Sequence, residues 1–91
     1  MSNVVDKECL ERNYIFLTNE IDALELLDRL VESKAISLSD RTRIVDTKSN
    51  FVRNRVLVNI ILNSSSEYVL NSFLKSLETK YKHVLDKLQE Q

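Results

Sequence analysis

Apolar residues recur along this chain at the three- and four-residue spacing of a helix, not in the alternation of a strand. The first stripe consists of Leu10, Tyr14 and Leu17. It predicts a helix over about Lys7–Glu20. Glu8 and Arg12 lie four residues apart outside this stripe, a spacing that favours an ion pair on the exposed side of the helix.

A second helix is predicted over about Asp22–Ser33. Its inward positions are Leu26, Leu27, Leu30 and Val31. Because the spacing of the first stripe continues into this segment, one long coiled-coil helix is an alternative, although Asp28 would then fall on its apolar seam. Asp22, followed three residues later by Glu25, instead has the pattern of a helix start. It favours a break between two helices.

The most apolar dozen in the chain is Phe51–Leu62, FVRNRVLVNIIL. Two apolar rows run along it, Val52, Val56 and Ile60 in one and Leu57 and Ile61 in the other. Its polar residues are too few to cover more than one face. A helix that is apolar over most of its circumference has to be covered by other helices. This segment is therefore predicted to be the central helix of a bundle.

Three shorter helices complete the pattern. One is capped at Ser37 or Ser39 and ends near Asp46, with Ile44 and Val45 as its apolar anchors. The next follows the polar turn 63–66, and the last runs from about Lys80 to Gln89. Their inward positions are Val69, Leu70, Phe73, Leu74, Leu77, Tyr81, Val84, Leu85 and Leu88. The fold class predicted is all-α, with six helices and the fourth at the centre.

Composition agrees with one small helical domain over residues 1–91. Apolar residues make up 43% and charged residues 30% of the chain, and there is no glycine or proline to form hairpin turns or a phosphate-binding loop. One cysteine and one histidine cannot build a disulfide or a zinc site. Cys9 is expected to be a small, partly buried hydrophobe and His83 a surface residue. We expect no catalytic residue, metal or cofactor, and no enzyme.

The N-terminus MSNVVDKE lacks the pattern of a secretory signal, and the longest apolar run is far short of a membrane span. A cytoplasmic protein is the expectation. Charge is divided unevenly: residues 1–46 hold ten acids and six bases, whereas residues 47–91 hold four acids and seven bases. A helix-turn-helix DNA binder would use the basic half, Arg53 and Arg55 above all, but the net charge of −1 argues against it.

Four segments together resemble the caspase recruitment domain (CARD) of the death-fold superfamily, from about Cys9 to Leu88. They are CLERNYIFL, IDALELLDRLVESKAISLSDRTRIV, VLVNIIL and SEYVLNSFLKSLETKYKHVLDKL. Within the family, the chain is most similar to the N-terminal CARD of apoptosome scaffolds. The resemblance implies a six-helix antiparallel bundle. This chain departs from the pattern in having no glycine after the second and fifth helices, where relatives often have it.

The resemblance also implies homotypic association, in which an acidic face of one CARD docks against a basic face of another. The acidic face would comprise Asp22, Glu25, Asp28, Glu32 and Asp40, from the second and third helices. The basic face would comprise Arg12, Lys48, Arg53 and Arg55, from the first and fourth helices. Asp28 matches an acidic position of the scaffold's caspase-binding face. The implied partner is the CARD of an initiator procaspase, with self-association also open, and without nucleic acid or membrane.

Three alternatives stay open within this resemblance: a CARD-only decoy, the CARD of an initiator caspase, and the CARD of an inflammasome protein. The sequence that follows Gln91 would separate a scaffold from a decoy. Every version requires that the acids of residues 22–32 are free to meet a partner rather than folded against the molecule's own arginines.

Overall fold

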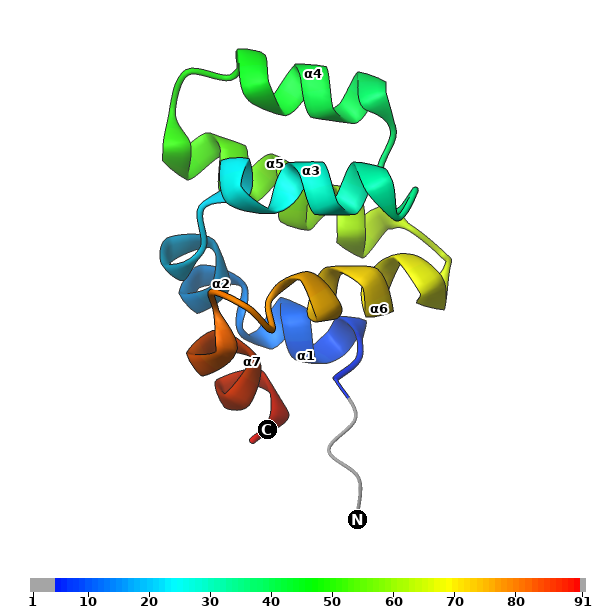
Figure 1. The fold of residues 1–91 in the computed structure, drawn as a ribbon. Coiled ribbons are helices and arrows are strands. Elements are labelled where there is room, and N and C mark those ends of the chain that lie inside the picture. The colour runs from blue at the N-terminus through cyan, green and yellow to red at the C-terminus, as the bar shows by residue number, and fades with distance from the viewer. Residues whose placement is uncertain (1–4, 91) are drawn as a thin grey trace.

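Seven helices make up the regular secondary structure of residues 5–90, the part of the chain that the computed structural model describes (Figure 1). In chain order they are α1 (Lys7–Arg12), α2 (Tyr14–Glu20), α3 (Ala23–Glu32), α4 (Leu38–Asp46), α5 (Asn50–Asn63), α6 (Glu67–Ser76) and α7 (Lys82–Gln89). These residues contain no strand, so the all-α prediction is confirmed. Within the same residues, no helix has the length and apolar character that crossing a membrane requires.

Four helices begin at a side chain that accepts a hydrogen bond from a backbone N–H of the first turn, which explains where they start. The capping residues are Asp6, Asp22, Ser37 and Ser49. The predicted cap at Asp22 is confirmed, and the cap of α4 is Ser37 rather than Ser39. Ser37 and Asp40 form a reciprocal capping box, in which each side chain accepts from the other residue's backbone N–H.

The helix predicted over residues 7–20 is interrupted at Asn13, so the six expected helices become seven. Asn13 leaves the helical conformation, with φ −106° and ψ 19°, and both its side-chain amide and its backbone N–H donate to the Cys9 carbonyl, at 2.9 and 3.1 Å. After α2, Ile21 and Asp22 adopt extended backbone. The alternative of one long helix through both segments is therefore wrong.

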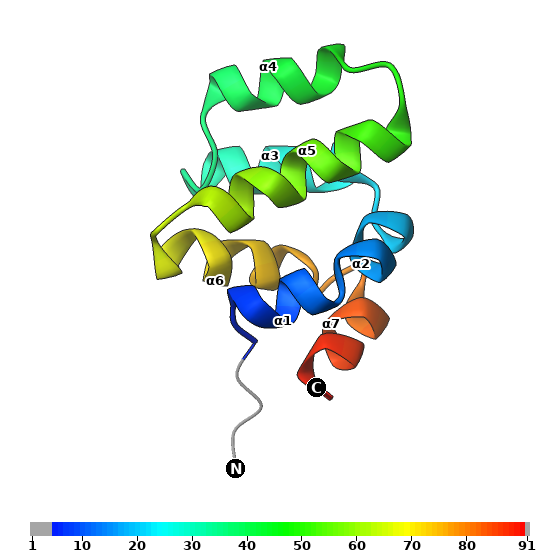
Figure 2. The ribbon, with the colours of Figure 1, turned by 180° about the vertical axis from the view of Figure 1, so that it is seen from behind.

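Helix α5 contacts α1, α2, α3, α4 and α6, which confirms it as the central helix (Figure 2). Leu57, Val58 and Ile61 on this helix are fully buried. Its first turn differs from the prediction, since Phe51 is 47% and Val52 42% exposed. That turn follows directly on the exposed loop from α4, at the end of the bundle, where few neighbours are available to cover it.

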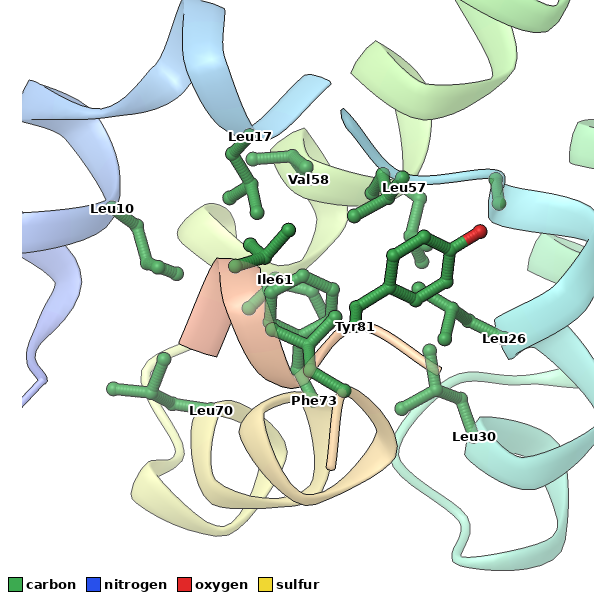
Figure 3. Packing of buried hydrophobic residues seen from close by; sticks show 14 of the residues in the cluster. Leu10, Leu17, Leu26, Leu30, Leu57, Val58, Ile61, Leu70, Phe73 and Tyr81 are labelled. Carbon is green, nitrogen blue, oxygen red and sulfur yellow. The ribbon is translucent and has the colours of Figure 1, made fainter. Parts of the chain in front are cut away.

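The core is built from the inward positions of all seven helices, and Phe73 of α6 lies in the middle of it (Figure 3). Predicted core residues that are buried include Leu10, Leu17, Leu26, Leu27, Leu30, Ile44, Leu70, Phe73, Leu77, Tyr81, Val84, Leu85 and Leu88. Val45, predicted as an anchor of α4, is 44% exposed, so Ile44 alone anchors that helix. Tyr14, Val31, Val69 and Leu74 are partly buried at the edge of the core.

The turn after α3 forms without a glycine. Lys34 takes a φ of 64°, in the left-handed region that glycine usually occupies. The backbone N–H of Ala35 then donates to the Leu30 carbonyl at 2.9 Å and closes the end of the helix. A non-glycine residue in this conformation costs about 1–2 kcal/mol, which the buried side chains on both sides of the turn offset.

Candidate protein-interaction surfaces

The five carboxylates predicted for the acidic face lie on and beside α3 and in the first turn of α4, two helices that contact each other (Figure 1). Asp22 and Asp40 are engaged in helix caps, Asp22 accepting from the Leu24 backbone N–H and Asp40 from that of Ser37. Glu25, Asp28 and Glu32 are exposed on α3. The five acids therefore lie in one region of the surface, but two of them are engaged in helix caps and three are not.

Asp28 is paired within the molecule. Its Oδ1 atom accepts a hydrogen bond from Arg41 Nε at 3.0 Å, across the α3–α4 contact. This differs from the expectation that the acids are clear of the protein's own arginines. Even so, 81% of the Asp28 side chain is exposed, and an exposed pair of this kind contributes only about 0–1 kcal/mol. An arginine from another molecule therefore has access to Asp28.

Glu25 is held by the start of α7 instead of by Arg29, the neighbour on its own helix. It accepts a hydrogen bond from the Tyr81 hydroxyl and another from Lys80 Nζ at 2.9 Å, whereas Arg29 donates to Thr79 Oγ1. The Tyr81 hydroxyl and, after it, Lys80 lower the pKa of the Glu25 carboxyl. Glu25 thus joins the acidic face to the last helix.

Tyr81 is mostly buried, and this burial, followed by its hydrogen bond to Glu25, raises the pKa of its phenol to about 12. In the unfolded chain that pKa is about 10. The folded state therefore holds the proton more tightly, so the stability due to this group is complete below about pH 10 and is lost as the pH rises through about 12.

We expect an alkaline titration, followed by tyrosinate absorbance, to show the ionisation of the Tyr81 phenol directly. The difference between the wild type and Tyr81→Phe should isolate one ionisation with a midpoint near pH 12 while circular dichroism still reports a folded protein. A midpoint near pH 10 in the folded protein would contradict the buried hydrogen bond to Glu25.

Residues of the predicted basic face come from two helices that contact each other, α1 and α5, and from the loop before α5. Arg12 ends α1 and forms the predicted pair with Glu8, at 3.3 Å. Lys48 is exposed in the loop. Arg53 has a structural contact, because its Nη1 atom donates to the Thr47 carbonyl at 2.6 Å and holds that loop against α5.

Arg55 is placed differently from the other three bases. Its guanidinium carbon lies 4.1 Å from the centre of the Phe51 ring and 5.9 Å from the centre of the Tyr14 ring. Among residues 5–90, no carboxylate forms a salt bridge with Arg55. Phe51 is one helical turn before Arg55, so the spacing in the sequence was a signal that could have suggested this contact.

Asn54 lies between Arg53 and Arg55 in the sequence, and it connects the helices that carry the two predicted faces. This role of Asn54 was not predicted from the sequence. Its side chain is 2% exposed, donates to the Thr18 and Ile21 carbonyls at 2.9 and 2.7 Å, and accepts from the Ala23 backbone N–H at 2.8 Å. These groups lie at the end of α2 and the start of α3, where a helix leaves backbone groups without partners. The bonds set the position of α3 relative to α5.

The residues considered for catalysis or metal binding have other roles. Cys9 is 2% exposed, its thiol donates to the Leu88 carbonyl at 3.3 Å, and burial raises its pKa. His83 is on the surface, as predicted, with Nε2 3.3 Å from a Glu20 carboxylate oxygen. Within residues 5–90, no three His, Cys, Asp or Glu residues form a group able to hold a metal ion. The charged surfaces remain as the candidate site.

Comparison with known proteins identifies the family of this chain. The family model described as "Caspase recruitment domain" matches residues 7–91. The match therefore covers every helix of the structure and all nine residues predicted for the two faces. No curated protein matches the chain.

Proposed function

This chain belongs to the caspase recruitment domain (CARD) family, and we propose that it recruits an initiator procaspase to an apoptosome-type signalling scaffold. CARDs are homotypic interaction modules that bind other death-fold domains. The finer proposal is that the acidic face, with the exposed carboxylate of Asp28 at its centre, meets arginines of the procaspase CARD. The proposed setting is the cytoplasm, and no catalysis is proposed for the domain itself.

The observation that supports this proposal is that the acids of one predicted face and the bases of the other lie on different parts of one bundle. The acids lie on α3 and α4, the bases on α1 and α5, and Asn54 holds α3 against α5. A surface and its complement at different places on one molecule make a head-to-tail contact, which extends into rings or helical assemblies. Such a geometry suits a module that gathers several proteases together.

The test of this proposal is a charge reversal at Asp28. We expect Asp28→Lys to weaken binding to an initiator procaspase CARD at least roughly tenfold, because it places a positive charge against the partner's arginines. Helicity should not change, since the side chain is exposed. Binding of the wild type should also fall as salt is raised. The measurement is a titration followed by isothermal calorimetry, with co-elution as a second readout.

A matched control for this test is Glu11→Lys, which makes the same change of charge at an exposed position of α1 outside both faces. It should leave the affinity within about twofold. Equal binding by Asp28→Lys and Glu11→Lys would rule out the acidic face as the procaspase contact.

A second candidate function, that of an initiator-caspase CARD, is favoured because the two faces differ in their ion pairs within the molecule. Asp28 and Glu25 already have basic partners inside the molecule, whereas Arg55 forms no salt bridge among residues 5–90. An initiator caspase would use its basic face to reach the acidic face of a scaffold. In that case Arg55→Glu, and not Asp28→Lys, would abolish binding to a scaffold CARD, so the same pair of variants separates the two functions.

A further inference from the structure

Phe51, Arg55 and Asn59 form a row along α5, each four residues from the next, and this row faces Tyr14 at the start of α2. The Tyr14 hydroxyl donates to Asn59 Oδ1 at 3.0 Å, and this hydrogen bond holds the end of the Tyr14 side chain against α5. Phe51 is 47% exposed and is not part of the hydrophobic core. Its one described partner is the Arg55 guanidinium.

The guanidinium of Arg55 therefore lies on one aromatic ring and within cation–π reach of a second. Its Nε atom is buried without a hydrogen-bond partner. The Nε atom of Arg53 is buried in the same way, but a terminal nitrogen of Arg53 already donates to the Thr47 carbonyl, whereas neither terminal nitrogen of Arg55 has a hydrogen-bond partner among residues 5–90. A planar guanidinium offers these two donors as a fork that matches the two oxygens of a carboxylate.

We propose that Phe51 and Tyr14 are positioning residues, which hold Arg55 flat and ready to bind a carboxylate from the acidic face of a second copy of this chain. Arg55 is then the anchor of the basic face, while Arg12 and Lys48 contribute charge without fixed geometry. This inference rests on the proposed homotypic function and adds to it the residue that carries recognition.

The physical reason is the entropy of a long side chain. A free arginine loses rotamer freedom when it binds, at a cost that an exposed ion pair hardly offsets. Arg55 has already lost that freedom against the two rings, so less is lost on docking. The second copy supplies the complementary charge, because its own α3 and α4 carry the carboxylates.

The test uses a defined probe, the full chain with Arg12→Glu and Arg55→Glu, which keeps its acidic face and has two of the four bases of the basic face reversed in charge. Each chain titrated with it also carries Asp28→Lys, so that one contact forms per pair. In this background we expect Phe51→Leu to weaken binding roughly fivefold and Phe51→Tyr to stay within about twofold. Arg55→Lys should lose roughly tenfold, nearly as much as Arg55→Ala. The matched control Arg43→Lys, at an exposed arginine outside both faces, should stay within about twofold.

A second measurement does not depend on binding. In the NMR spectrum of the free chain, the Arg55 Nε–Hε signal should be shifted by the Phe51 ring current, lose this shift in Phe51→Leu and keep it in Phe51→Tyr. Binding of the probe without any loss in Phe51→Leu and Arg55→Lys would overturn the inference and leave the proposed function standing. Failure of the probe to bind the reference chain, with the ring-current shift present, would also overturn the inference, while recruitment of a procaspase CARD would still be decided separately by the Asp28→Lys titration.

Discussion

Replacing Asn54 with leucine should lower the free energy of unfolding by about 3 kcal/mol, since the change leaves three backbone groups without partners. Leucine has the same branched shape as asparagine and is larger, so the loss does not come from a cavity. The Thr18 and Ile21 carbonyls and the Ala23 N–H would stay buried beside an apolar side chain. In a chain of 91 residues, whose stability is about 5–14 kcal/mol, this is a large fraction.

Urea unfolding followed by circular dichroism measures this effect. The matched control is Asn63→Leu, the same substitution at an exposed position at the end of the same helix, which should change stability by less than about 0.5 kcal/mol. A loss of under about 1 kcal/mol for Asn54→Leu would mean that the carbonyls find other donors. Asn54→Leu should also weaken CARD binding at temperatures where it is still folded, since α3 would no longer be held against α5.

The second large effect is expected at Phe73, which is fully buried at the centre of the core (Figure 3). Phe73→Ala removes a ring that the neighbouring helices cannot move in to replace, because they surround it on several sides. The expected loss of unfolding free energy is about 3–5 kcal/mol. Thermal and urea unfolding should both show it, and much of the protein should be unfolded at moderately raised temperature.

The same substitution on the surface provides the comparison. Phe51→Ala deletes an aromatic ring that is 47% exposed, and we expect it to cost less than about 1 kcal/mol of stability. The two phenylalanines therefore separate folding from recognition: Phe73 supports the fold, and Phe51 supports Arg55. Similar losses at both positions would show that Phe51 also has a part in the core.

The central position of α5 was predictable because it depends on one local property. Leu57, Val58 and Ile61 are apolar in a helix with few polar residues, and such a helix has to be covered wherever it sits. The break at Asn13 was not predictable in the same way. The stripe of apolar residues continues through it, so the spacing gives no sign that the backbone leaves the helical conformation at Asn13.

Asn54 shows most clearly what could not be predicted from the sequence. It is a polar residue between two arginines in the sequence, and in the structure it is 2% exposed. Its burial depends on where α2 ends and α3 begins, because the free backbone groups at that joint need a partner. Nothing in the spacing along α5 reports a joint more than thirty residues away.

The amino-acid sequence by itself determined the helices, their inward faces and the uneven distribution of charge, since each follows from residues within a few turns of one another. The tertiary structure alone decided which charges are free. Asp28 meets Arg41 and Glu25 meets Lys80 and Tyr81, while Arg55 lies on aromatic rings and has no acidic partner among residues 5–90. Ion pairing depends on distances of a few ångströms between side chains, and folding sets those distances between residues that are far apart in the chain.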